Sequence, residues 1–432
     1  MPTKRGLPGP DWPWRPRYSI WAAGRSALRE NGERHSVRRT ETRSFNMKRM
    51  CVGISLAALM LLSACTGKPA GEAPSGVYYD ITGVDPAETV LVLDGNEIPA
   101  ELYCYWAAFN CSALEYQLKM YHDYFGMYEE VFQDDGTIDW NAKFPSSDMT
   151  LNQYAKDMAE DTVFFYAAIE NLADQYGVTL TEEDEAAIDE EMEGMKESLG
   201  GEEEFQNYLE ETGLSVDNLR RVMSATSLLD GLMELAGQEG SEIYLDPAKY
   251  GDYLGYTDYI FLSTDGLSED EAAAKRQTAG DILAQLEQAE DKDARFAELA
   301  TEYNEDTNRG ETGYFYTPGT LPAAVEEAAA ALEPGAVSEL VESEEGLYLV
   351  LGKSLEEGLA GDPQQTDAVL QNYVVELVNT YQEEMEVERR GTLTDMEMGE
   401  FYQKYLDEMD QRALDDATEI LDGAATSTEP QS

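Results

Sequence analysis

Side chains that commonly act as nucleophiles, general bases or metal ligands are scarce in this chain, which has four cysteines and two histidines. The histidines, His35 and His122, lie far apart in the sequence. Cys104 and Cys111 are separated by two turns of a predicted helix, roughly 10 Å, which is beyond the reach of a disulfide. The sequence has no CxxC pair or Cys/His cluster typical of a metal site. We therefore expect no metal site, no histidine-based catalysis, and two thiols that pack as small hydrophobic groups.

Cys65 follows a short apolar segment. From Met47 the sequence is MKRMCVGISLAALMLLSAC, in which a basic start precedes an apolar stretch, residues 51–62, and then small residues. This is the order of regions in a secretory signal peptide, and the stretch is too short to span a bilayer as a helix. Its end, Leu62-Ser63-Ala64-Cys65, resembles the bacterial lipobox, which implies a lipid on the Cys65 thiol and a membrane anchor. A plain secretory signal with a chance cysteine is the alternative.

Two segments flank this signal peptide, which is predicted at residues 47–64. Residues 1–46 are rich in Arg, Trp and Pro, and we interpret them as a misassigned or unstructured leader upstream of a start at Met47. Residues 65–88 are predicted to be the lipidated cysteine and a flexible tether rich in Gly and Pro. The end of the chain, residues 416–432, is predicted to be a disordered tail.

The formal net charge of the chain is -57 at pH 7. So acidic a surface repels phosphate backbones and anionic lipid headgroups, which makes nucleic acid an improbable partner. It suits contact with cationic or neutral partners. The alternative interpretation is a solvated acidic surface that has no bearing on partner choice.

Helical patterns dominate the chain beyond the tether. Residues 89–99 predict a short strand, a turn at Asp94-Gly95 and the start of a helix, and helices continue to about residue 240. Thr181 begins a predicted capping box. Apolar residues recur at helical spacing in residues 366–389, which predicts a helix packed on other helices.

Residues 250–355 have a different pattern. Their predicted order is strand, helix, helix, strand, helix, strand, strand, in about a hundred residues. The sequence therefore predicts an α+β fold in which a mostly helical domain, made of N- and C-terminal parts, carries a small inserted β-α-α-β-α-β-β domain.

Four segments of this insert resemble, in order and spacing, the parvulin-type peptidyl-prolyl isomerases. They are Phe296–Tyr303, Gly310–Phe315, Leu332–Ser338 and Gly346–Val350. With the lipobox and the flanking helical regions, the chain resembles the PrsA/SurA group of extracytoplasmic foldases over most of residues 89–400. The resemblance implies a helical N-terminal region, a parvulin-like (PpiC-like) domain, and C-terminal helices that pack on the N-terminal region, at residues 89–248, 249–356 and 357–415.

The resemblance implies a reaction that needs no cofactor. An X–Pro peptide bond rotates over a barrier of roughly 18–20 kcal/mol, set by amide resonance. In the family, an apolar pocket seats the proline ring beside a polar network of two histidines and a Cys or Asp. Here the two histidine positions hold Tyr259 and Tyr348, and Asp306 stands at the Cys/Asp position. These three are the predicted catalytic residues, with a geometry altered by the longer tyrosine side chains.

The proline pocket is predicted to be smaller or less aromatic than in the family. Its Met and Phe positions fall near Leu321 and Val325, or near Thr320 and Ala324 if a one-residue insertion sits later. Phe315 is the third residue that we expect to line the pocket.

The segment 101–130 is dense in aromatic residues and Met, which suits adaptable binding of unfolded polypeptides. Within it, Tyr121, Tyr124, Phe125 and Tyr128 are spaced too closely for one helical face. We predict that some of these four side chains are exposed in a client-binding groove. The alternative is that most of them belong to the core.

Three hypotheses about function remain open. The first is a membrane-anchored foldase, on the outer face of the bacterial cell membrane, with modest isomerase activity. The second is a chaperone or scaffold whose insert binds peptides without catalysis. The third is a lipoprotein with another function, such as solute binding. Under the first two, the partners are unfolded or newly secreted polypeptides and the membrane, and a homodimer is left open.

Overall fold

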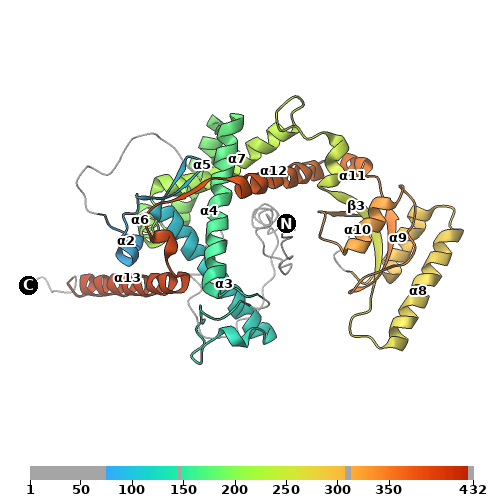
Figure 1. The fold of residues 1–432 in the computed structure, drawn as a ribbon, viewed down its shortest axis with the longest axis horizontal. Coiled ribbons are helices and arrows are strands. Elements are labelled where there is room, and N and C mark those ends of the chain that lie inside the picture. Colours follow the sequence, from blue (N-terminus) through green and yellow to red (C-terminus); the bar gives the residue numbers. More distant parts are fainter. Residues whose placement is uncertain (1–73, 145–146, 307–312, 427–432) are drawn as a thin grey trace, which may run out of the picture. The chain divides into compact units, whose positions relative to one another are not determined.

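The computed structural model describes residues 74–144, 147–306 and 313–426, with side chains up to residue 414 (Figure 1). The predicted leader, the signal peptide and Cys65 lie outside the described residues. The chain divides into two compact units. Unit 1 holds the described residues up to Asn171, Thr179–Leu228 and those from Glu384 on, and unit 2 holds Leu172–Val178 and Leu229–Glu383. Of the helices in the described ranges, none has the length and apolar character needed to cross a membrane.

Unit 1 contains an antiparallel sheet with the strand order β2-β1-β7. β1 (Thr89–Leu93) and β2 (Asn96–Pro99) form a hairpin, and its turn has positive φ at Asp94 (50°) and Gly95 (89°). An Asp-Gly pair suits such a turn because both central residues need φ above zero. The predicted turn is therefore confirmed. β7 (Val387–Arg389) pairs with the other edge of β1.

Long helices make up most of unit 1, and the last turns of α4 and α7 are counted with unit 2. The predicted capping box is confirmed at the start of α5, where the Thr181 hydroxyl accepts a bond from the Asp184 N–H. The Asp184 carboxylate accepts one from the Thr181 N–H, so that two backbone donors are satisfied. The helices are α3 (Ala100–Phe125), α4 (Leu151–Tyr176), α5 (Glu182–Leu199), α6 (Glu202–Thr212), α7 (Val216–Gly237) and α13 (Met398–Thr426), with the 3-10 turns η1 (Glu129–Val131) and η3 (Leu393–Asp395).

A short helix, α2 (Val77–Thr82), lies within the predicted flexible tether 65–88. Val77 and Tyr78 are buried, and the ring of Tyr78 lies 6.2 Å from the ring of Phe401 in α13. The tether prediction is therefore wrong for the residues of α2. Burial of two large apolar side chains offsets the chain entropy that a flexible segment would keep.

The predicted C-terminal region, residues 357–415, is divided between the units. α12 (Gln364–Glu384) belongs to unit 2 up to Glu383, whereas α13 packs against α2 and α3 in unit 1. α13 also continues to Thr426, so that the disordered tail predicted from residue 416 is wrong as far as Thr426.

The two cysteines that the structure describes, Cys104 and Cys111, lie in α3, are buried and form no disulfide. This confirms the prediction of two packed thiols. Burial raises the pKa of both thiols, which keeps them protonated and chemically inert.

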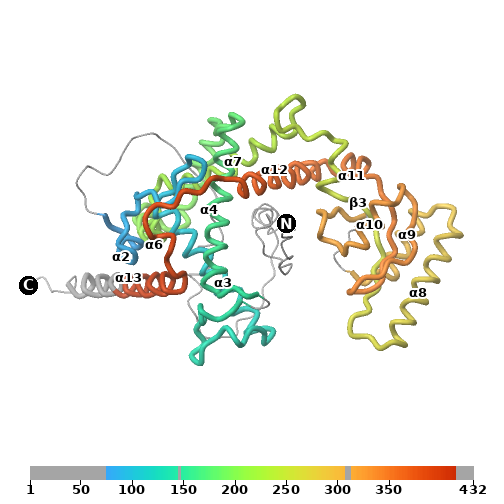
Figure 2. The backbone as a smooth tube through the Cα atoms, in the orientation of Figure 1, coloured from blue at the N-terminus to red at the C-terminus, as the bar shows by residue number. Residues whose placement is uncertain are grey.

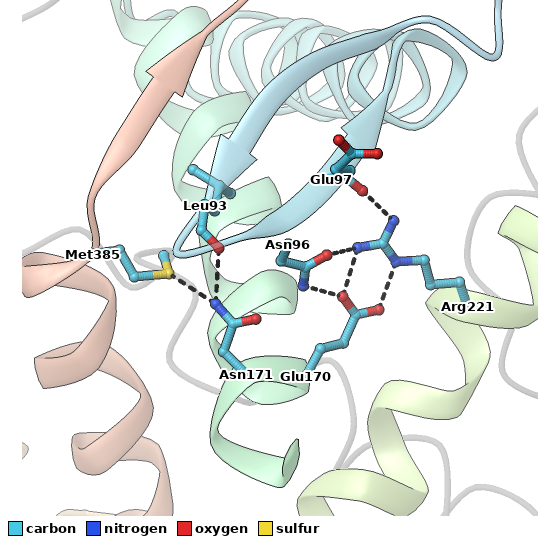
Figure 3. A network of polar contacts seen from close by, with 7 residues as sticks. All are labelled: Leu93, Asn96, Glu97, Glu170, Asn171, Arg221 and Met385. Atoms are coloured by element: carbon cyan, nitrogen blue, oxygen red, sulfur yellow. Dashed lines mark hydrogen bonds and ion pairs between the residues drawn. The ribbon is translucent and has the colours of Figure 1, made fainter. Parts of the chain in front are cut away.

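A polar network ties the hairpin of unit 1 to two helices (Figure 3). The guanidinium of Arg221 in α7 donates two bonds of 2.7 Å to the Glu170 carboxylate in α4. It also donates to the Asn96 side chain at 2.5 Å and to the Glu97 backbone carbonyl at 2.9 Å, both in β2. One side chain thus fixes the positions of three elements, and the planar fork of Arg is what allows it.

Unit 2 contains a four-stranded antiparallel sheet with the order β4-β3-β6-β5. Residues on one face of β3 and β6 pack under α8 and α9, and residues on the other face pack against α10 (Figure 1). The predicted order of elements is confirmed. The bounds are β3 (Gly255–Ser263), α8 (Glu269–Gln288), α9 (Lys292–Tyr303), β4 (Tyr314–Tyr316), α10 (Ala323–Ala331), β5 (Val341–Glu342) and β6 (Gly346–Gly352).

Three further elements complete unit 2, and Figure 2 follows the chain through them. They are η2 (Pro247–Asp252), α11 (Leu355–Gly361) and α12. Val369 of α12 is fully buried in a cluster with Leu245 and Leu254. The unit is therefore wider than the predicted insert, residues 249–356.

Candidate functional site

The candidate site lies on the face of the unit 2 sheet that packs against α10. In the register of β3 and β6, Tyr259 lies opposite Val350 and Phe261 lies opposite Tyr348. Side chains alternate between the two faces of a strand, so these four residues share one face. Their intervening neighbours, such as Ile260 and Leu349, form the core under α8 and α9.

The segment that follows α9 runs along the edge of β3 and positions Asp306. The Asn304 side chain accepts a bond of 2.7 Å from the Phe261 N–H, and the Glu305 N–H donates to the Phe261 carbonyl at 2.9 Å. Asn304 also donates to the Asp306 carbonyl at 2.7 Å. Asp306 is thereby held beside the sheet, and the Tyr259 hydroxyl donates to its carboxylate at 2.5 Å.

Tyr348 turns its hydroxyl to a different carboxylate. It donates to Glu345 at 3.2 Å. The Tyr348 ring lies 4.7 Å from the ring of Phe261 and 5.7 Å from that of Tyr259. The structure therefore brings all three predicted catalytic residues to one face, where the two phenols contact each other through their rings and bond to separate acids.

Burial determines the charge state of both phenols. Tyr259 is 2% exposed and Tyr348 is 5% exposed. Burial first, and then the hydrogen bond to Asp306, raise the pKa of Tyr259 far above its ordinary value. Burial, followed by the charge of Glu345, raises the pKa of Tyr348. Both side chains are neutral hydrogen-bond donors at physiological pH and cannot act as general bases.

The residues of the predicted proline pocket separate into two groups. Val325 is fully buried against Tyr259 and Tyr348, and Leu321 packs at the margin of the same cluster. The alternative pair, Thr320 and Ala324, is exposed. Of the two placements, the one at Leu321 and Val325 is therefore the one that adjoins the tyrosines.

Phe315 does not join this group, which corrects its predicted place in the pocket. Its ring stacks on Tyr256 at 4.3 Å, in the cluster that contains Leu254 and Val369. Its neighbour Tyr314 faces the site instead, with its ring 5.5 Å from that of Tyr259. Successive side chains of a strand point to opposite faces, so Tyr314 and Phe315 in β4 face different sides of the sheet.

The loop before α10 is held by one carboxylate. Glu326 accepts bonds from the backbone N–H groups of Gly319 (2.8 Å) and Leu321 (2.9 Å). This fixes the entry of α10 over the sheet. The resulting arrangement is an apolar cluster of rings, covered by α10, with the Asp306 carboxylate at its edge. Within the described ranges, no group of three or more His, Cys, Asp or Glu side chains is placed to hold a metal ion.

The four predicted client-binding residues lie in unit 1, where α3 ends and η1 begins. Tyr124 and Phe125 are 81% and 67% exposed, whereas Tyr121 and Tyr128 are half-buried. The ring of Tyr121 lies 5.8 Å from those of both Phe125 and Tyr128. The prediction that some of the four are exposed is confirmed, and their role in binding stays a prediction.

Parts of the chain match known proteins. Residues 259–353 match the PPIC-type PPIASE domain of the rotamase family. Foldase protein PrsA of Oceanobacillus iheyensis is 27% identical over 217 residues, 48% of this chain and 66% of that protein. Foldase protein PrsA of Halalkalibacterium halodurans is 30% identical over 234 residues, 52% of this chain and 64% of that protein. The match thus spans somewhat less than two thirds of each relative.

Two solved structures show a weaker likeness. A peptidylprolyl isomerase (PrsA) from Bacillus cereus is 17% identical, with a TM-score of 0.29, and covers 69% of this chain and 89% of that one. A SurA-like chaperone from Campylobacter jejuni is 15% identical, with a TM-score of 0.19, and covers 62% of this chain and 94% of that one. The chain therefore carries a PPIC-type peptidyl-prolyl isomerase domain at residues 259–353 and is similar, over about half of its length, to the PrsA foldases.

Proposed function

We propose that this chain is a lipid-anchored, extracytoplasmic foldase that binds unfolded exported polypeptides. The observation that carries the proposal is the PPIC-type domain at residues 259–353, in a chain similar to proteins named foldase PrsA. In this proposal residues 249–356 are the inserted isomerase-like domain. Residues 89–248 and the C-terminal helices form the chaperone part, and Cys65 holds the lipid.

The proposed site of proline isomerisation is the apolar face between Tyr259, Tyr348 and Leu321. An amide in apolar surroundings loses part of the solvation that favours its planar, charge-separated form, which lowers the barrier to rotation. The Tyr259–Asp306 pair places a polar group at the edge of this face. Asp306 is proposed to orient the bound peptide, and Tyr259 to hold that carboxylate in place.

Burial at this face favours a second candidate function, a PPIC-type domain that binds peptides without isomerising them. Val325 is fully buried and the two tyrosine rings are almost so, with 2% and 5% of their surfaces exposed. A proline ring could reach these side chains only if α10 or the loop before it moved. In that case the chaperone part would carry the function and the insert would serve as a support.

A proline isomerisation assay coupled to a protease separates the two candidates. The full chain is compared with Asp306→Ala and Leu321→Asp, and with Asp270→Ala in the first turn of α8 as a control. An isomerase loses at least about tenfold in rate when Asp306 or Leu321 is changed, which corresponds to about 1.4 kcal/mol, and keeps its rate in the control. A full chain that never exceeds the buffer rate eliminates catalysis.

Client binding is tested independently by the aggregation of a denatured model protein diluted into buffer. The proposal expects the full chain to slow light scattering at near-equimolar concentration, with or without isomerase activity. Unchanged aggregation, together with no binding to the denatured protein, would contradict the foldase function as a whole.

Solute binding would require a cavity large enough for an organic ligand. A cavity in unit 1 is lined by residues of α3, α4 and α7, among them Trp106, Tyr166 and Val222. Its volume is about 10 Å³, which is room for about one water molecule. A cavity of this size excludes an organic ligand.

A further inference from the structure

The end of α3 and the turn after it form an exposed, aromatic and acidic surface, here called the α3 tip (residues 121–132). We propose that the α3 tip is a docking surface for unfolded polypeptide segments that carry Lys or Arg among apolar residues. This inference rests on the proposed binding of unfolded clients and specifies their chemistry.

The backbone of the α3 tip turns sharply and spreads its aromatic side chains. α3 ends at Gly126, which has a φ of 63° and donates to the His122 carbonyl at 2.9 Å. Tyr128 follows with a φ of 63°, a conformation that a residue with a side chain rarely adopts. These two left-handed residues end α3 and reverse the chain direction directly after Tyr124 and Phe125.

The exposed apolar side chains are adjacent and large. Tyr124, Phe125 and Met127 are 81%, 67% and 42% exposed. Such a group of aromatic and Met side chains costs free energy in water and is a common feature of interaction sites. Aromatic faces and Met also adapt to varied apolar partners without a preformed pocket.

Acidic residues flank these side chains in the sequence. The side chains of Asp123 and Glu129 are 70% and 86% exposed, and Glu130 and Asp134 are also exposed. Across residues 121–135, His122 is the one basic side chain. A segment with Lys or Arg can place its cations over the rings and beside the carboxylates while its apolar side chains cover Phe125 and Met127.

The same charge disfavours the other partners that an exposed aromatic surface could take. An anionic lipid surface would be repelled by the carboxylates of the tip. A second copy of the chain would bring two acidic tips together, and each copy carries a net charge of -57. A cationic, unfolded segment is the occupant whose chemistry complements both features of the tip.

The test uses three unstructured, dye-labelled peptides that share the same Leu and Phe residues and carry Lys, Gln or Glu at the other positions. Fluorescence polarisation with the full chain measures Kd at low and high salt. The Lys peptide is expected to bind about tenfold more tightly than the Gln peptide at low salt and the Glu peptide most weakly, with smaller differences at high salt. Equal affinity for the three peptides overturns the proposal and leaves client binding intact.

Two pairs of variants locate the site. Y124S/F125S is expected to weaken the binding of the Lys and Gln peptides by at least about fivefold. Leu414→Ser removes another exposed apolar side chain and is expected to leave the Kd of both peptides unchanged. E130Q/D134N is expected to weaken the binding of the Lys peptide alone, by about two- to threefold. E190Q/E197Q makes the same change in net charge on α5 and has no effect. Unchanged binding by Y124S/F125S places the site elsewhere.

The remaining outcomes also decide the question. If no peptide binds the full chain, the proposed client binding fails together with this inference. Cosedimentation with phosphatidylcholine vesicles that depends on Tyr124 and Phe125 would identify a membrane as the occupant and overturn the proposal. A dimer in light scattering that Y124S/F125S dissociates would overturn it in favour of a second copy.

Discussion

By resemblance to the parvulin-type isomerases, Tyr259 and Tyr348 are predicted to occupy the positions of the family's two histidines. A buried phenol differs in chemistry from an imidazole. Burial raises the pKa of both hydroxyls, whereas an imidazole exchanges its proton near neutral pH. The two tyrosines can therefore donate hydrogen bonds but cannot shuttle protons at physiological pH. Any rate enhancement at this face has to come from desolvation of the amide and from hydrogen bonding.

Tyr259→Phe tests how strongly the phenol is tied to Asp306. Loss of the hydroxyl removes one hydrogen bond from a half-buried carboxylate, which lowers the opening free energy of β3 and β6 by about 0.5–1.5 kcal/mol. Tyr348→Phe is the matched control with a smaller effect, because its bond is 3.2 Å long and its acceptor, Glu345, is exposed. Hydrogen exchange with mass spectrometry of peptides from β3 and β6 measures the change in opening free energy in both variants. Equal effects of the two changes would contradict the proposed role of the Tyr259–Asp306 bond.

His122 confers a pH dependence on the α3 tip. Its ring lies between Asp123 (3.0 Å) and Glu129 (2.9 Å), and these hydrogen bonds raise its pKa above the ordinary 6.5. Protonation is thus more favourable in the folded chain than in the unfolded one. The contribution to stability is fully present below the unfolded pKa and is lost as pH rises through the higher folded value.

Titration of the His122 ring by NMR, with the chain in urea as the unfolded reference, checks this shift. Glu129→Gln is expected to lower the folded pKa, because it removes one of the two acceptors. Glu130→Gln removes a neighbouring charge that makes no bond to the ring and should have a smaller effect. A folded pKa at or below that in urea would refute the assignment.

At the scale of elements, close backbone packing constrains the sheet of unit 2. A Cβ atom on Gly352 in β6 would lie 2.5 Å from the Glu333 backbone carbonyl, which no side-chain rotation can relieve. Gly280 lies within α8, where a Cβ atom would meet nothing within 4 Å. Packing therefore requires a glycine at position 352 and does not require one at position 280.

Gly352→Ala is expected to destabilise unit 2 by more than about 1 kcal/mol, because β6 or the segment at Glu333 has to shift. Gly280→Ala is expected to stabilise it by about 0.5–1 kcal/mol, since Ala loses less backbone entropy in a helix. Hydrogen exchange of β3 and β6 amides measures the first change, and exchange of α8 amides the second. Two effects of the same sign would contradict this account of the packing.

At the scale of the whole molecule, the proposed lipid on Cys65 would hold the chain at a membrane. Wild-type protein expressed in a Gram-positive host is expected in the membrane fraction. Cys65→Ala should release it, because the thiol that would carry the lipid is gone. Cys51→Ala changes a cysteine in the same signal peptide and should leave retention unaltered. Membrane retention of the Cys65→Ala chain would refute the anchor.

Local patterns determined much of the fold from the sequence. The Asp94-Gly95 turn, the capping box at Thr181 and the element order of the insert follow from residue types at short range, and all three are confirmed. The approximate site also follows from the sequence, because Tyr259, Asp306 and Tyr348 lie on elements whose order and spacing resemble a known family. The exposure of Tyr124 and Phe125 was predictable because four aromatic residues crowd a short segment.

Tertiary structure alone decided which side chains are buried and which residues they contact. The helix at Val77–Thr82 exists because the Tyr78 ring packs against Phe401 of α13, more than three hundred residues away, and no local pattern encodes that contact. Tyr314 rather than Phe315 faces the site because the register of β4 against β3 selects one side of the strand. The hydroxyls of Tyr259 and Tyr348 bond to different acids because the segment after α9 and the turn before β6 bring Asp306 and Glu345 to separate places. Sequence spacing determines which residues can share an element, whereas long-range packing determines which of them meet.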